Sequence, residues 1–184
     1  MDIESAQKAI STKEWKKAVA AYESSDTARG LWQMANSILP FFFLWFLMVR
    51  SLEISYWVTL VLALPTAGFM IRIFIIFHDC GHGSFFKSKR ANTIVGYIAG
   101  ILTFTPYHNW RHHHAVHHAS AGDLDRRGVG DVMIWTVDEY QAASKWKKLF
   151  YRISHHPAVV FTLGAWGVFI LAHRLPTKPG GRRE

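Results

Sequence analysis

The stretch "YWVTLVLALPTAGFMIRIFIIF", Tyr56 to Phe77, decides the fold because it runs for 22 residues with a single charge, Arg72. As an α-helix rising about 1.5 Å per residue, it is long enough to cross a hydrocarbon core about 30 Å thick. The stretch therefore predicts a transmembrane helix, in keeping with a 184-residue chain of which 50% is hydrophobic.

A second uncharged stretch, Leu31 to Val49, comes just before the first. It is long enough to span a membrane, although Gln33, Asn36 and Pro40 make its first half less apolar. Only Arg50 to Ser55 separate the two stretches, which is too little chain for a domain. The sequence therefore predicts an antiparallel transmembrane hairpin.

Two further apolar segments are too short to span a membrane without their flanks. Pro157 to Ala172 would reach only about 24 Å as a helix, and its topology stays open. Ile94 to Thr105 is shorter still and indicates a re-entrant or interfacial segment, or a buried helix.

We expect an all-α membrane protein in four parts. They are a cytoplasmic N-terminal amphipathic segment (1–30), the transmembrane hairpin (31–77), a cytoplasmic histidine-rich region (78–156), and a third hydrophobic segment with a tail (157–184). Ser11 and Glu14 form a capping-box pattern, which predicts a helix either at the membrane surface or in solvent. Residues 137–153 show a second helical pattern after a Gly- and Asp-rich irregular stretch.

The net charge of +8 favours a membrane partner over nucleic acid because of where the charges lie. Ten Lys or Arg residues fall between His78 and His156, whereas the hairpin tip balances one Arg with one Glu. The positive-inside rule then predicts that the N-terminus and the histidine-rich region face the cytoplasm. No cleavable signal peptide is visible, and the single cysteine, Cys80, excludes an intrachain disulfide.

Eight of the eleven histidines gather in "FHDCGHGSFF" and "HNWRHHHAVHH". They are His78, His82, His108, His112, His113, His114, His117 and His118. His78 and His82 are spaced i, i+4, and His114, His117 and His118 are spaced i, i+3, i+4, so each set shares one face of a helix. Five neutral imidazoles suit Zn, Cu, Fe or Ni rather than Ca or Mg, and the pattern predicts a metal site.

Other interpretations of the histidines are weaker. A zinc protease places Glu after its first histidine, whereas Asp79 stands here. The sequence contains no G-x-S-x-G nucleophile elbow, so nucleophilic catalysis has little support. His112 and His113 lie on other faces and are as readily surface residues, and His155, His156 and His173 are expected to be structural.

The motif "HDCGHGSFF" resembles the first histidine box of the integral-membrane fatty acid desaturases, and "HAVHHASAGDLD" resembles their second. "WQMANSILPFF" and the order of the segments are also similar to acyl-lipid and omega-6 type members. The resemblance implies two iron ions that activate dioxygen and remove two hydrogens from an acyl chain in fatty acid biosynthesis. It also implies an acyl-chain substrate in membrane lipid and an electron donor such as ferredoxin or a cytochrome.

Carried onto this sequence, the resemblance implies that one set of histidines binds the iron. A second set of residues would accept or donate hydrogen bonds to those histidines and so orient them. No catalytic residue beyond the ligands is expected. The ligands are His78, His82, His114, His117 and His118, and the outer candidates are Asp79, His108, Asp123 and Asp125.

The family's third H-x-x-H-H box has no counterpart here, because Arg152 stands three residues before His155. We therefore expect the N-terminal portion of a desaturase that is inactive alone. Another histidine-box oxygenase, such as a hydroxylase or ketolase, and a non-catalytic membrane fragment remain alternatives.

Overall fold

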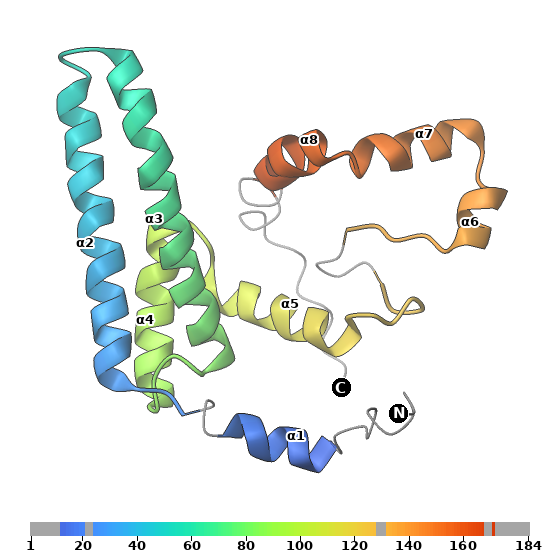
Figure 1. The fold of residues 1–184 in the computed structure, drawn as a ribbon, viewed down its shortest axis with the longest axis horizontal. Coiled ribbons are helices and arrows are strands. Elements are labelled where there is room, and N and C mark those ends of the chain that lie inside the picture. The colour runs from blue at the N-terminus through green and yellow to red at the C-terminus, as the bar shows by residue number, and fades with distance from the viewer. Residues whose placement is uncertain (1–11, 21–23, 128–131, 168–170, 172–184) are drawn as a thin grey trace, which may run out of the picture. The chain divides into compact units, whose positions relative to one another are not determined.

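The computed structural model describes residues 12–20, 24–127, 132–167 and 171, and within them the fold is all-α, as predicted (Figure 1). The elements are α1 (Thr12–Val19), α2 (Thr27–Ser51), α3 (Tyr56–His82), α4 (Lys89–Leu102), α5 (Tyr107–Ser120), α6 (Val137–Ala142), α7 (Lys145–Ser154), α8 (Pro157–Val159) and a π-helix, η3 (Val160–Gly164). The chain divides into two compact units, residues 1–99 and 100–184, and each is described by itself.

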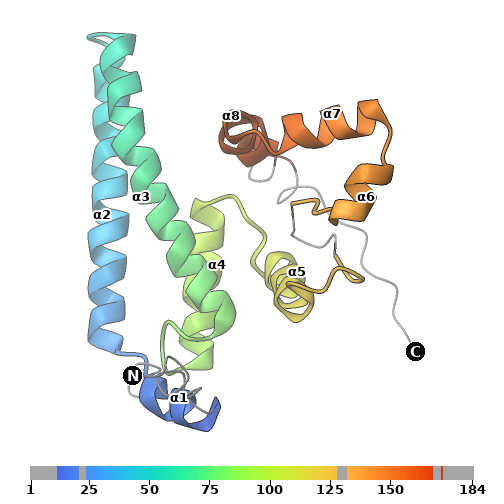
Figure 2. The same cartoon turned by 45° about the vertical axis from the view of Figure 1, so that its right-hand side comes forward.

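The predicted hairpin is present in the first unit, where α2 and α3 run antiparallel and are joined by a short turn (Figures 1 and 2). Both helices are long and apolar enough to cross a membrane. They are also longer than the hydrophobic stretches that predicted them. Asp26 caps α2 by accepting from the Arg29 N–H at 3.0 Å, and α3 continues through His82.

Polar side chains lie between the two helices of the hairpin. Arg72, the one charge in the predicted second span, donates from Nε to Ser37 Oγ at 3.2 Å and from its terminal nitrogen to Asn36 Oδ1. Nearer the turn, Ser51 Oγ and Thr59 Oγ1 are 2.7 Å apart. Hydrogen bonds between helices substitute for water where none is available, so these pairs stabilise the hairpin inside a membrane.

Large apolar side chains point away from the hairpin. Phe43, Val61 and Leu64 are 61%, 66% and 76% exposed. A helix in the core of a soluble protein buries such residues, whereas a membrane helix presents them to lipid. The arrangement of the hairpin therefore agrees with the membrane interpretation of its sequence.

Gly30 of α2 is required by close packing against Phe86. A Cβ atom added at Gly30 would lie 2.9 Å from the Phe86 ring, whereas one added at Gly68 would meet nothing within 4 Å. We expect Gly30→Ala to destabilise the hairpin by up to about 2 kcal/mol, because overpacking costs about 1–3 kcal/mol and alanine recovers at most about 1 kcal/mol of helix propensity.

Gly68→Ala is the matched control, and it should leave stability unchanged or slightly raised. Thermal unfolding in detergent, followed by circular dichroism, compares the two variants. Equal melting temperatures would contradict the packing argument.

The second unit begins α6 and α7 at separate caps, so the helical pattern predicted for 137–153 is broken in two. Thr136 and Glu139 form a capping box at α6, and Ser144 accepts from the Lys147 N–H at the start of α7. Arg127 donates to the Ile134 carbonyl at 2.7 Å and to the Glu139 carboxylate. The hydrogen bond from Arg127 lowers the pKa of Glu139 below its ordinary value.

The remaining predicted segments are partly visible. Ile94 to Thr105 lies mostly in α4, and the segment that starts at Pro157 is helical through α8 and η3. Much of the C-terminal part of that segment and the Ser11 cap lie outside the described residues.

Candidate metal centre

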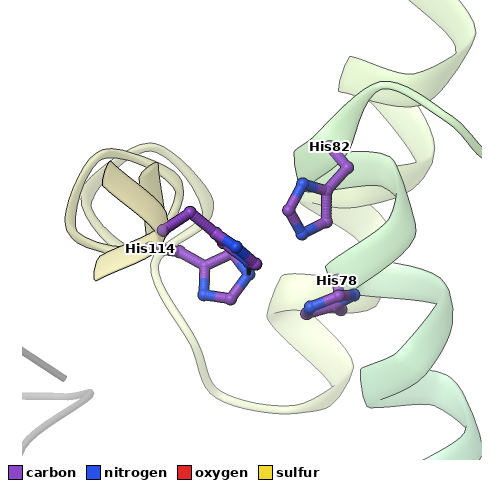
Figure 3. Close-up of side chains that lie close together, drawn as sticks. His78, His82 and His114 are labelled. Atoms are coloured by element: carbon purple, nitrogen blue, oxygen red, sulfur yellow. Dashed lines mark hydrogen bonds between the residues drawn. The ribbon is translucent and has the colours of Figure 1, made fainter. Parts of the chain in front are cut away.

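The first histidine pair occupies the last turn of α3. The ring centroids of His78 and His82 are 4.6 Å apart, and Figure 3 shows both rings on the same side of the helix. Gly83 ends α3 in the left-handed conformation, with φ of +73°, and its N–H donates to the Cys80 carbonyl at 3.0 Å. The i, i+4 spacing therefore places both imidazoles on one face of the helix, as the sequence predicted. Both residues are included because α3 ends at His82.

Asp79 lies beside the first of these rings. His78 Nδ1 and Asp79 Oδ1 are 3.0 Å apart, and both side chains are partly exposed. An Nδ1–H donated to this carboxylate leaves Nε2 as the lone-pair atom and holds the ring in one orientation. The outer role expected for Asp79 stays a prediction.

Asn92 of α4 has a structural role that was not predicted from the sequence. It is 2% exposed, and its Oδ1 accepts from the Phe86 N–H at 2.9 Å. Its amide nitrogen donates to three carbonyls: Phe86 at 2.7 Å, Gly83 at 3.1 Å and Ser88 at 3.2 Å. The buried side chain of Asn92 therefore stabilises the turn that follows His82. The only signal in the sequence was that Asn92 follows shortly after a loop, because the backbone N–H and C=O groups of a loop need hydrogen-bond partners.

The second histidine set lies on α5. The Nε2 atoms of His114 and His118 are 3.1 Å apart, and the two ring planes are perpendicular at 89°. His117 lies next to them, its ring centroid 6.1 Å from that of His114 and 5.8 Å from that of His118. The Nε2 atoms of these two imidazoles therefore converge on one side of α5. Figure 3 shows His114 on α5.

Trp110 supports this set from the preceding turn. Its ring stacks on His114 with centroids 4.3 Å apart and planes 17° from parallel, and Trp110 itself is 9% exposed. Stacking on a buried ring limits the rotation of His114. Trp110 was not among the residues predicted from the sequence, although its i, i+4 spacing to His114 was a usable signal.

The remaining histidines of α5 and the other predicted outer aspartates lie in the second unit. His108 is exposed in the first turn of α5, and His112 and His113 follow one turn later, with ring centroids 5.6 Å apart. Asp123 lies beyond α5, where Arg126 Nε donates to it at 2.6 Å and lowers the pKa of its carboxyl. Asp123 also accepts from the backbone N–H of Asp125 at 3.0 Å.

Comparison with known proteins identifies the family. The family described as "Fatty acid desaturase" matches residues 55–183, which include α3 and both histidine sets. The chain belongs to the fatty acid desaturase family. A fatty acid desaturase of Bacillus subtilis (strain 168) is 48% identical over 172 residues, covering 94% of this chain and 49% of the relative.

Two desaturases of Synechocystis sp. match shorter parts. The sn-1 acyl-lipid omega-3 desaturase (ferredoxin) is 47% identical over 53 residues, 29% of this chain and 15% of the relative. The sn-1 oleoyl-lipid 12-desaturase is 37% identical over 84 residues, 46% of this chain and 23% of the relative. The chain thus spans about half the length of the Bacillus relative and less of the others. No solved structure matches it.

Proposed function

We propose that this chain supplies the first two histidine boxes of a membrane fatty acid desaturase, which introduces a double bond into an acyl chain with dioxygen at a di-iron site. The observation that carries the proposal is the pair of helical histidine faces, on α3 and on α5, in a member of this family. The resemblance to the family's first two histidine boxes leads us to assign both faces to one di-iron centre.

The donors suit iron. We assign four of the proposed iron ligands to His78 and His82 of α3 and to His114 and His118 of α5. His117 is the fifth proposed ligand, from its place in the family's second box. Neutral imidazole is a ligand that iron accepts readily, and Asp79 at His78 Nδ1 provides the outer support that such ligands commonly have. Outer roles for His108, Asp123 and Asp125 stay predictions.

Bound iron would supply the reactivity toward dioxygen that an unactivated methylene requires, because no side chain can take such a hydrogen as a proton at neutral pH. The residues of the chain do the rest. Asp79 orients His78, stacking on Trp110 orients His114, and Asn92 holds the turn behind His82. Each imidazole has to offer an unprotonated ring nitrogen to bind a metal ion.

The names of the relatives indicate a class of substrate and a class of electron donor. Two cyanobacterial relatives are named as ferredoxin-dependent acyl-lipid desaturases. We infer an acyl chain in membrane lipid as the substrate, and a ferredoxin-type protein as the electron donor, with a cytochrome as the other candidate.

The test is a chimera in which this chain replaces the matching segment of the Bacillus subtilis relative. The chimera is expressed in a membrane host that lacks its own desaturase, and the acyl chains are analysed by gas chromatography and mass spectrometry. New double bonds are expected. Hydroxylated or keto products would favour another histidine-box oxygenase, and unchanged lipids with no bound iron would favour a non-catalytic role.

The proposed topology places the histidine region in the cytoplasm. In a Cys80→Ala background, a cysteine replacing the exposed Lys87 should resist an impermeant thiol reagent applied outside intact cells. A cysteine replacing Leu52, at the hairpin turn, is the matched control and should react, because the hairpin carries it to the opposite surface. The reverse pattern of labelling would invert the topology.

A further inference from the structure

Helix α7 exposes a continuous apolar face. Trp146, Leu149, Phe150 and Ile153 follow the spacing i, i+3, i+4, i+7 and are 80%, 46%, 62% and 51% exposed. This spacing places all four on one side of the helix. Such a face ordinarily packs against a partner, because leaving it in water forfeits the free energy of burial.

The other side of α7 is already packed within the unit. The Tyr151 ring stacks on Trp135 with centroids 4.7 Å apart and on His155 at 4.0 Å. Arg152 Nε donates to the Tyr140 hydroxyl at 2.6 Å. These contacts hold α7 against α6, so the apolar face is a second surface and not the misplaced core face of the helix.

Positive charge borders the apolar face. On a helical wheel Lys145 and Lys147 lie about 100° to either side of its centre, and α7 contains no acidic residue. Lys148, further round, donates to the Gln141 carbonyl at 2.9 Å. An apolar face that carries a tryptophan and is bordered by lysines on both sides is typical of helices that lie in the surface of an anionic membrane.

The chain after α7 also requires an apolar environment. Only His155 and His156 separate α7 from α8, a connection of at most about 11 Å even when fully extended. Beyond it Phe161, Leu163 and Trp166 are 81%, 70% and 59% exposed. If the apolar segment after α8 enters a bilayer, the short connection keeps α7 close to the surface of that bilayer.

We propose that α7 lies along the surface of the membrane, with Trp146, Leu149, Phe150 and Ile153 among the upper acyl chains and with Lys145 and Lys147 on the phosphates of anionic lipids. The occupant of the apolar face is thus a lipid surface and not a second protein. The proposal does not depend on the metal centre.

The test uses the full chain in lipid nanodiscs, in a Cys80→Ala background. An environment-sensitive fluorophore is attached at Phe150→Cys on the apolar face, or at Lys148→Cys on the far side as the matched control. The nanodiscs contain phosphatidylcholine alone or mixed with phosphatidylglycerol, and quenching is compared between nitroxide-labelled lipid and aqueous iodide. The hairpin anchors the chain in every sample, so loss of α7 binding is not confused with loss of the protein.

The Phe150 label should be quenched by the lipid nitroxide, more strongly in the anionic mixture, and the Lys148 label by iodide. In the anionic mixture Lys145→Gln and Lys147→Gln should each shift the equilibrium off the surface by about fivefold, since one basic residue contributes about 1 kcal/mol there. Quenching of the Phe150 label by iodide would overturn the proposal. Shielding from both quenchers would also overturn it, because a protein would then cover the face.

Discussion

Replacing His114 by alanine in the chimera is expected to abolish desaturation and to lower iron affinity by at least about 100-fold. Loss of an outer partner of a metal ligand alone costs about 10–100-fold, and loss of the ligand should cost more. His114 is the most informative choice, because its Nε2 lies 3.1 Å from that of His118 and its ring is stacked on Trp110. Iron in the purified protein and unsaturated acyl chains in the membrane are measured together.

Alanine at His78, His82, His117 or His118 should have the same effect. His155→Ala is the matched control, because His155 Nδ1 lies 2.7 Å from the Tyr151 carbonyl and its ring stacks on Tyr151, which indicates a structural role. That variant should keep its iron. Full activity and full iron content in the His114 variant would remove the basis for the proposed centre.

Replacing Asn92 by leucine should destabilise the first unit by about 2–6 kcal/mol. The substitution keeps the bulk of the side chain but removes the partners of the Phe86 N–H and C=O, both of them in buried hydrogen bonds. Each buried group left without a partner costs about 1–3 kcal/mol. The midpoint of thermal unfolding should fall by on the order of 10 °C.

The single cysteine provides the measurement. Cys80 is 1% exposed, so a dye that fluoresces on reaction with thiols reports its release as the protein is heated. Thr93→Ala is the matched control, since the Thr93 hydroxyl bonds only one turn back, to the Lys89 carbonyl at 3.0 Å. Its melting point should stay near that of the parent. A shift as large as that of Asn92→Leu would show that any change in α4 loosens the unit.

Both histidine faces could be predicted because they depend on local geometry. Spacings of three and four residues converge on one face of any α-helix, and α3 and α5 are helical where they carry these residues. The break between α6 and α7 could also have been predicted locally, because Thr136, Glu139 and Ser144 are helix-capping residues. It was not predicted because the helical pattern of hydrophobic residues continues across the break.

The roles of Asn36 and Arg72 could not be predicted in this way. Asn36 was interpreted as weakening the first span and Arg72 as the one charge of the second, but they lie 36 residues apart in the sequence and form a hydrogen bond. Asn92 is a similar case, because its value comes from four backbone groups in the turn that it faces. The periodicity of a sequence indicates which face of a helix a residue lies on, but it does not indicate which residues of another element will face it.

The sequence by itself determined the transmembrane hairpin, the helical class and the histidine faces, since apolar runs and i, i+4 spacings act within one helix. Tertiary structure decided which polar residues stabilise the hairpin, how Asn92 holds the turn after His82, and which face of α7 is left uncovered. The physical reason is that a buried hydrogen bond or an exposed apolar face depends on neighbours that only the folded chain brings near.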